Sequence, residues 1–241
     1  MPTYSQLWPK YAKQWDSMVV QSNFNAVAKK ILANKNRYIV LEGRTGVPWY
    51  LIGLLHLREA DLNFNTQLAQ GDPLSRRSTH VPRGRGPFRT WEEGGYDALV
   101  VLKGWDKVQD WRLEKVLYYA ELYNGWGYFN HGVPSAYLWA GSSVYRGGKY
   151  VADGVWSSTA RDSQPGVAAV LKVLMEMDPS IKPDRESNVA SNAVAGGAVV
   201  AGASAAANWM DWAPYILVGA VAVAIVGWLL VKYFKNRKGN I

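Results

Sequence analysis

Residues 49–60 read WYLIGLLHLREA. The long apolar run predicts a helix over residues 48–60 that is buried along most of its length. Glu59 lies near the end of this helix, and Leu55 and His56 precede it at helical spacings, so they share its face. A carboxyl group in such half-buried, apolar surroundings has a raised pKa and can donate a proton near neutral pH. Cleavage of a glycosidic bond requires an acid of this kind.

The composition is that of a globular protein without disulfides. The chain has 241 residues, of which 49% are hydrophobic and 19% are charged, enough for one sizeable domain and additional segments. The absence of cysteine excludes disulfide scaffolds and thiolate metal sites. His56, His80 and His131 show no metal-ligand spacing, so neither a metal nor a cofactor is predicted. The 12 Trp and 14 Tyr residues indicate an aromatic core, part of which is expected to line a sugar-binding cleft.

The net charge of +8 predicts an anionic partner. No helix-turn-helix, zinc finger or aromatic RNA-binding motif accompanies the charge, so no specific nucleic acid is expected. An anionic envelope polymer or a membrane surface fits as well. Part of the charge is concentrated in one stretch, which is either a solvated loop or a site of attraction to such a polymer, and comprises Arg76, Arg77, Arg83, Arg85 and Arg89.

Hydrophobic periodicity predicts a mainly helical domain over residues 1–182. Helices are expected at about 3–34, 48–60, 96–103, 110–123 and 167–177. Residues 61–93 and 125–165 are expected to be irregular, with short strands near 137–140 and 149–151.

The composition changes after residue 182. Residues 183–211 are rich in Ala, Gly and Ser, which predicts a flexible linker or, alternatively, a second membrane segment. Residues 212–232 are strongly apolar, with aromatic residues near both ends, and predict a transmembrane helix that makes the lipid bilayer a partner. Residues 233–241 form a basic tail. No secretory signal peptide is recognised at the N-terminus, which leaves the membrane topology and the export route open.

The sequence that follows Glu59 resembles a known family. Residues 59–74 read EADLNFNTQLAQGDPL, which resembles the lysozyme-like muramidases of phages and bacteria, a group related to goose-type lysozymes and lytic transglycosylases. In goose-type enzymes the catalytic Glu ends a helix, and the Asp of a Gly-Asp pair lies thirteen positions downstream. Glu59 and Asp72 reproduce this spacing. Other resembling segments are 80–85, 123–128, 137–145 and 148–154, and the resemblance covers roughly residues 5–180. The chain departs from the goose-type pattern because it lacks a Gly-Leu-Met-Gln-like segment. The arginine-rich residues 76–89 occupy its place.

The resemblance implies a catalytic mechanism. Glu59 is expected to protonate the bridging oxygen between N-acetylmuramic acid and N-acetylglucosamine, while an oxocarbenium-like centre develops on the sugar. Asp72 is expected to hold a water for hydrolysis, and Asp97 is the next candidate for this role. Attack by the muramic acid C6 hydroxyl would instead give a 1,6-anhydro product. For Asp72 the sequence also allows a purely local role, because Gly-Asp-Pro favours a turn stabilised by the Asp side chain.

Further residues are predicted to contact the substrate. Tyr123 and Asn124 resemble the Tyr-Asn sequence of lytic transglycosylases, although Asn-Gly also ends a helix well. His56 either bonds to the Glu59 carboxyl or packs in the core. Three aromatic residues are assigned either to sugar contacts or to core packing: Tyr137, Trp139 and Tyr145. Glu114 and Glu121 share a helical face and are expected to form exposed salt bridges.

These observations predict the following fold class and function. The fold class is mainly α, as an α+β lysozyme-like domain with a small β element, plus a C-terminal transmembrane helix. The function is cleavage of peptidoglycan glycan strands, either by a lysis enzyme at the bacterial inner membrane or by a virion lysozyme with ejection-complex proteins as partners. The alternatives are a lytic transglycosylase and a non-catalytic structural membrane or virion protein with a lysozyme-like fold.

Overall fold

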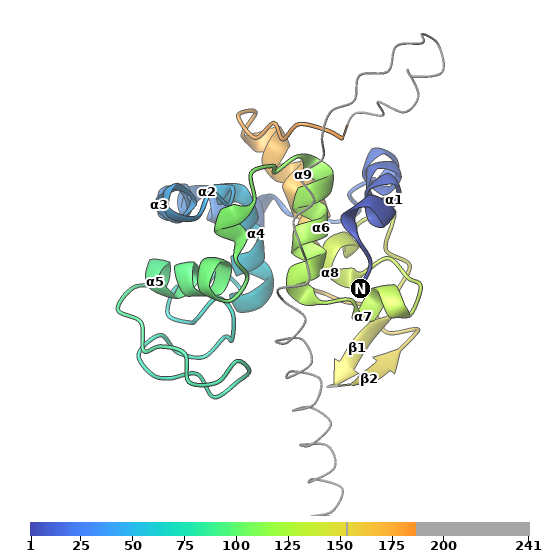
Figure 1. Cartoon of the computed structure of the whole chain (residues 1–241). Coiled ribbons are helices and arrows are strands. Elements are labelled where there is room, and N and C mark those ends of the chain that lie inside the picture. The colour runs from blue at the N-terminus through green and yellow to red at the C-terminus, as the bar shows by residue number, and fades with distance from the viewer. Residues whose placement is uncertain (153, 187–241) are drawn as a thin grey trace, which may run out of the picture. The chain divides into compact units, whose positions relative to one another are not determined.

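The apolar stretch at residues 49–60 forms helix α4 (Trp49–Ala60), in which every residue from Trp49 to Leu57 is buried. The computed structural model describes residues 1–152 and 154–186, which belong to one compact unit (Figure 1). The other elements, in chain order, are α1 (Tyr4–Ser17), α2 (Asn25–Ala33), α3 (Lys35–Thr45), α5 (Trp91–Tyr96), the π-helix η1 (Asp97–Val101), the 3-10 helix η2 (Trp105–Lys107), α6 (Leu113–Asn124), α7 (Gly127–Asn130), α8 (Ala136–Trp139), β1 (Lys149–Ala152), β2 (Val155–Ser157) and α9 (Val167–Met177).

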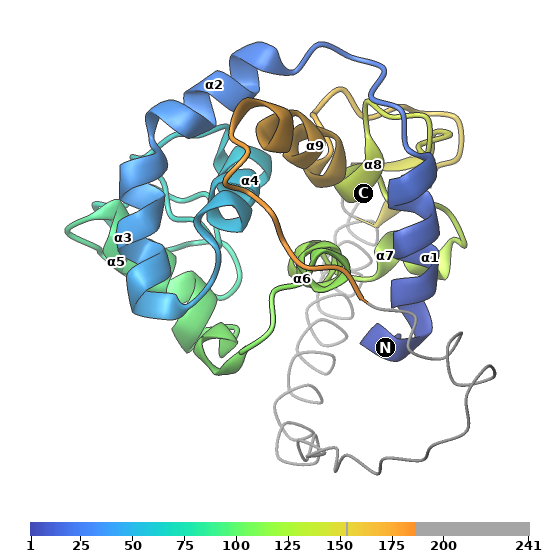
Figure 2. The same cartoon turned by 90° about the horizontal axis from the view of Figure 1, so that it is seen from above.

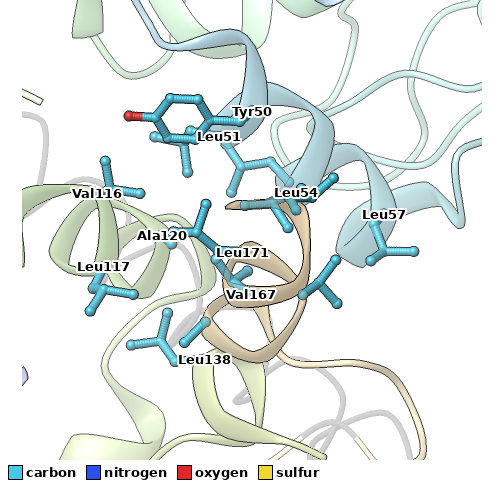
Figure 3. Packing of buried hydrophobic residues seen from close by; sticks show 14 of the residues in the cluster. Tyr50, Leu51, Leu54, Leu57, Val116, Leu117, Ala120, Leu138, Val167 and Leu171 are labelled. Atoms are coloured by element: carbon cyan, nitrogen blue, oxygen red, sulfur yellow. The ribbon is translucent and has the colours of Figure 1, made fainter. Parts of the chain in front are cut away.

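The core lies where α4, α6, α8 and α9 meet. Helix α6 contacts α1, α4, α8 and α9 and is seen end-on among its neighbours in Figure 2. Apolar side chains from the four helices face one another in Figure 3, and those labelled there are Tyr50, Leu51, Leu54, Leu57, Val116, Leu117, Ala120, Leu138, Val167 and Leu171. This packing fixes the end of α4, where Glu59 lies, against α8 and α9.

Several predicted elements agree with the structure. Helices at 48–60, 110–123 and 167–177 correspond to α4, α6 and α9, and the strand near 149–151 corresponds to β1, which pairs antiparallel with β2. Residues 61–90 contain neither helix nor strand, as expected from their Gly, Pro and Arg content.

Other predicted elements differ from the structure. The helix expected over 3–34 is two helices, because the intervening backbone pairs with residues 141–143: Gln21 N donates to Gly141 O at 2.8 Å and Ser143 N to Val19 O at 2.8 Å. The strand expected near 137–140 is the short helix α8, whose start is capped by the Ser135 side chain accepting a hydrogen bond from Leu138 N.

Helix α3 was not expected from the sequence. It buries Tyr38, Leu41 and Thr45, three positions at helical spacing among polar neighbours. The helix ends at Gly46, whose φ of 71° suits glycine.

The domain extends beyond its predicted boundary at residue 182. Leu113 N donates to Asp184 O at 2.7 Å, and Glu114, fully buried on α6, accepts hydrogen bonds from Arg185 Nε at 2.6 Å and from Glu186 N at 2.8 Å. Residues 183–186 are therefore part of the domain and not of a linker. The expectation that Glu114 forms an exposed salt bridge is wrong, because its carboxylate is enclosed.

The predicted fold class is also wrong in including a transmembrane helix. Within residues 1–152 and 154–186, no helix combines the length and the apolar character needed to cross a bilayer. The segments on which the membrane prediction rests, 187–211 and 212–232, lie outside the described residues, as does the tail at 233–241. The structure supports a mainly helical domain with a two-stranded sheet.

Candidate active site

Glu59 faces a cleft of about 350 Å³. Four segments of the chain form its walls: the end of α4, loop 61–90, the residues after η1, and the end of α6. The lining residues are Glu59, Ala69, Val81, Pro82, Leu102, Lys103 and Tyr123. Within the described part of the chain, Glu59 is the one acidic residue that lines this cleft, so a single carboxyl group is available for chemistry there.

The surroundings of Glu59 favour its protonated form. Burial raises the pKa of this half-buried carboxyl group, whereas a hydrogen bond from Tyr137 and the positive charges of Arg58 and Lys103 oppose the rise. The Tyr137 hydroxyl donates to Glu59 Oε1 at 2.7 Å. Oε1 is thereby held in place by a neutral donor.

A buried ion pair between Arg58 and Asp162 supports the position of Tyr137. Arg58 Nη2 lies 3.1 Å from Asp162 Oδ2, with the two side chains 6% and 7% exposed. The guanidinium carbon of Arg58 is 4.8 Å from the centre of the Tyr137 ring. Asp162 also pairs with Lys149 of β1 at 3.2 Å. The orientation of Tyr137, and through it that of Glu59, therefore depends on contacts from α4, α8 and the β1–β2 hairpin.

Asp72 is bound within its own loop and does not line the cleft. It accepts hydrogen bonds from the backbone N–H groups of Thr79 and His80 at 3.0 and 3.1 Å and from the Thr79 hydroxyl at 3.0 Å, and His80 Nδ1 lies 3.0 Å away. These contacts, led by the backbone N–H of His80, lower the pKa of Asp72 to about 2. The carboxylate thus fixes the backbone just before Val81 and Pro82, which form a wall of the cleft.

Asp97 is also occupied by a partner. It lies on η1, is buried, and forms a bidentate ion pair with Arg85, in which Nε is 2.9 Å from Oδ2 and Nη2 contacts Oδ1. Asp97 does not line the cleft. Neither aspartate predicted to hold a water is therefore brought to the cleft beside Glu59.

His56 and Trp139 are core residues. His56 has no exposed surface and Trp139 is 1% exposed, and a side chain without accessible surface cannot contact a sugar. His56 Nδ1 lies 3.1 Å from the Tyr38 hydroxyl rather than bonding to Glu59, and burial lowers the pKa of His56 to about 4. The packing role is therefore the one that the structure gives to both residues.

The remaining predicted contacts differ in their position. Tyr123 lines the cleft, and its hydroxyl donates to Leu68 O at 3.2 Å. Asn124 is exposed at the end of α6 and does not line the cleft. Tyr145 is buried, and its hydroxyl donates to Gly148 O at 3.0 Å. Tyr137, assigned to either a sugar contact or core packing, is buried, and its hydroxyl donates to Glu59.

Sequence reasoning missed Lys103 and the role of Arg58. Lys103 follows η1, lines the cleft, and places its Nζ 4.9 Å from the centre of the Tyr123 ring. A lone lysine after an apolar segment carries no signal for such a position. The adjacency of Arg58 to Glu59 was visible, but its partner Asp162 is 104 residues away. No group of three or more metal-ligating side chains occurs among the residues the structure covers.

The chain was compared with protein-family models, curated proteins and solved structures, and it matches none of them. The resemblance to lysozyme-like muramidases therefore stays a prediction from short sequence segments. Among the described residues, the cleft presents one carboxyl group, that of Glu59, which accepts a hydrogen bond from Tyr137 and shares the cleft lining with Lys103.

Proposed function

We propose that this chain cleaves the glycan strands of peptidoglycan, with Glu59 as the general acid. The observation that carries the proposal is the position of Glu59, whose carboxyl group has a raised pKa and lines an open cleft. A general acid needs both features, because it must hold a proton near neutral pH and reach the substrate. The resemblance of residues 59–74 to lysozyme-like muramidases supports peptidoglycan as the substrate.

The proposed first step is protonation of the bridging oxygen. The Glu59 proton passes to the oxygen that links C1 of N-acetylmuramic acid to C4 of the next sugar. The C1–O bond then breaks, and positive charge develops on the muramic acid ring. Tyr137 donates a hydrogen bond to Oε1, which stabilises the carboxylate that forms and leaves the other carboxyl oxygen to act on the substrate.

The second step needs a nucleophile for C1. Because Asp72 and Asp97 are bound elsewhere, the described residues offer no second carboxylate in the cleft to activate a water. This observation favours the alternative reaction, in which the muramic acid C6 hydroxyl attacks C1. A C1–O6 bond forms, and the C6 hydroxyl proton returns to the Glu59 carboxylate, so that the group is ready for another cycle. The product then carries a 1,6-anhydro end.

Activity on purified cell walls tests the proposal. The Glu59→Gln variant keeps the size of the side chain but cannot donate the proton, and we expect it to lose wall-clearing activity at least about a hundredfold. Glu176→Gln is a matched control, because Glu176 is exposed on α9 and away from the cleft lining. Equal clearing by the wild type and by Glu59→Gln would refute the role of Glu59. A wild type that clears no walls would favour a structural protein.

A further inference from the structure

Lys103 is the one basic residue that lines the Glu59 cleft in the described part of the chain. Its side chain is exposed, and its Nζ lies 4.9 Å from the centre of the Tyr123 ring. No carboxylate of the described residues forms an ion pair with it within 4 Å. The charge of Lys103 opposes the rise of the Glu59 pKa. Its exposed ammonium group can in addition bind an anionic ligand in the cleft.

The neighbouring wall of the cleft adds further positive charge. Val81 and Pro82 line the cleft, and Arg83 follows them directly with an exposed side chain. Among the described residues, the two aspartates nearest to Arg83 in the sequence have other partners: Asp72 is bound by Thr79 and His80, and Asp97 is bound by Arg85. This edge of the cleft is therefore cationic.

Internal hydrogen bonds brace the backbone on both sides of Arg83. The Ser78 hydroxyl donates to Pro82 O at 2.9 Å and accepts from Arg85 N at 2.9 Å. Gln67 Nε2 donates to Arg76 O at 2.9 Å. Arg83 is thus carried by a braced loop, and a preorganised charge binds an anion with little loss of conformational entropy.

We propose that Lys103 and Arg83 form a subsite that binds the carboxylates of the peptide stems attached to the glycan strand. This inference rests on the proposed function and extends it to the substrate class, because a peptide stem offers these two cations several carboxylates, whereas a stripped strand offers only the lactyl carboxylate of each muramic acid. The muramic acid residues carry the peptides beside the bond to be cleaved, which is where a cationic edge of the cleft can contact them. Charge-assisted contacts of this kind favour peptide-bearing strands over stripped strands.

The test compares two forms of one substrate. Glycan oligosaccharides that carry their peptide stems, and the same oligosaccharides after enzymatic removal of the stems, are given to the wild type and to each variant. The measured quantity is the ratio of kcat/KM for the peptide-bearing form to kcat/KM for the stripped form. We expect this ratio to fall about tenfold in Lys103→Gln and severalfold in Arg83→Gln, mainly through KM. Lys103→Arg and Arg83→Lys keep the charge and should retain most of the ratio.

Lys29→Gln is the control for net charge, since Lys29 is exposed on α2 and outside the cleft lining. A ratio that stays at the wild-type value in Lys103→Gln and Arg83→Gln would overturn the subsite. A shift of the pH optimum of Lys103→Gln that is equal for both substrates is expected from the effect of Lys103 on Glu59; if this shift occurs while the ratio stays at the wild-type value, Lys103 acts on Glu59 alone and the subsite is overturned. Loss of binding to anionic lipid vesicles without any change in the ratio would assign the charge to a membrane instead.

Failure of the two proposals can be told apart in this experiment. A wild type that cleaves neither substrate refutes the proposed function, and the subsite with it. A wild type that cleaves both substrates, with a ratio unaffected by the variants, refutes the subsite alone. Far-ultraviolet circular dichroism and thermal unfolding of every variant confirm that the comparison is made between folded proteins.

Discussion

Replacing Glu121 by Gln is expected to stabilise the protein above pH 7. Glu121 lies on α6, is 4% exposed, and accepts a hydrogen bond from Ser135. Burial raises the pKa of Glu121 to about 7, although the charges of Lys10 and Arg58 and the hydrogen bond from Ser135 oppose the rise. Among the described residues its Oε1 atom has no hydrogen-bond partner, so the ionised form lacks a compensating contact there. The sequence had suggested an exposed salt bridge for Glu121, which is wrong.

The size of the effect follows from linkage. A carboxyl group with a higher pKa in the folded than in the unfolded protein binds more protons when folded, so stability falls as the pH rises between the two values. For Glu121 these values are 4.5 and about 7. At about 1.4 kcal/mol for each pKa unit, ionisation of Glu121 lowers the free energy of unfolding by about 3 kcal/mol above pH 7. Gln is neutral at every pH and avoids this loss.

The surroundings of Glu121 accommodate the new amide. Gln14 Oε1 is a second buried acceptor without a partner, and both residues line the same small cavity of about 20 Å³. A Gln side chain at position 121 brings an N–H donor into this cavity, whereas the carboxylate brings none. The replacement therefore removes a buried charge and adds a donor among unpaired acceptors.

Urea unfolding at pH 5 and pH 8 measures the prediction. The free energy of unfolding of Glu121→Gln should exceed that of the wild type by about 2 to 3 kcal/mol at pH 8, and by much less at pH 5. Glu176→Gln, at an exposed position, should change the stability by less than about 0.5 kcal/mol at both values. An equal stability change at both pH values, or a less stable Glu121→Gln at pH 8, would refute the reasoning.

Three further predictions concern the site and the fold. Tyr137→Phe removes a hydrogen bond that lowers the pKa of Glu59. The pH at which activity falls with rising pH should therefore increase, and kcat should decrease about tenfold; an unchanged pH–rate profile would contradict the positioning role. Asp72→Asn weakens the hydrogen bonds that fix loop 61–90, so trypsin should cleave this loop faster at neutral pH than in the wild type; equal rates would show that the loop is held by other contacts. Gly166→Ala places a β-carbon against the backbone at the end of α8 and should lower the free energy of unfolding by at least about 2 kcal/mol. Gly43→Ala on α3 meets no atom of the described residues within 4 Å and should raise the free energy of unfolding by about 0.5 to 1 kcal/mol. Thermal unfolding compares the two variants, and equal effects would show that the backbone near α8 moves to accommodate the new methyl group.

Local patterns were sufficient to predict the helix that carries the acid. The continuous apolar run of α4 identified a buried helix, and the position of Glu59 at its end followed from helical spacing alone. Helix α3 was missed because its few buried positions, such as Tyr38 and Leu41, are separated by polar and charged residues. The aromatic residues of Tyr137–Ala140 favour a strand, but the Ser135 side chain caps this segment, which forms helix α8.

The contacts that complete the site lie beyond the reach of local patterns. Tyr137 and Glu59 are 78 residues apart in the chain, and the packing of α8 against α9 and α6 brings the hydroxyl to the carboxyl group. Asp72 shows the opposite case. Its partners Thr79 and His80 are seven and eight residues away, and the local turn chemistry of Gly-Asp-Pro pointed to such a role. The thirteen-residue spacing from Glu59 pointed to catalysis, and the structure keeps Asp72 outside the cleft lining.

Mass spectrometry of the fragments released from purified peptidoglycan tests the central claim most directly. The account predicts that the wild type releases fragments cut between N-acetylmuramic acid and N-acetylglucosamine, with 1,6-anhydro ends predominating, and that Glu59→Gln releases almost none. Hydrolytic reducing ends in place of anhydro ends would show that a water reaches C1 and would correct the second step. Release of the same fragments in equal amounts by Glu59→Gln, or no release by the wild type, would contradict the assignment of Glu59 as the general acid.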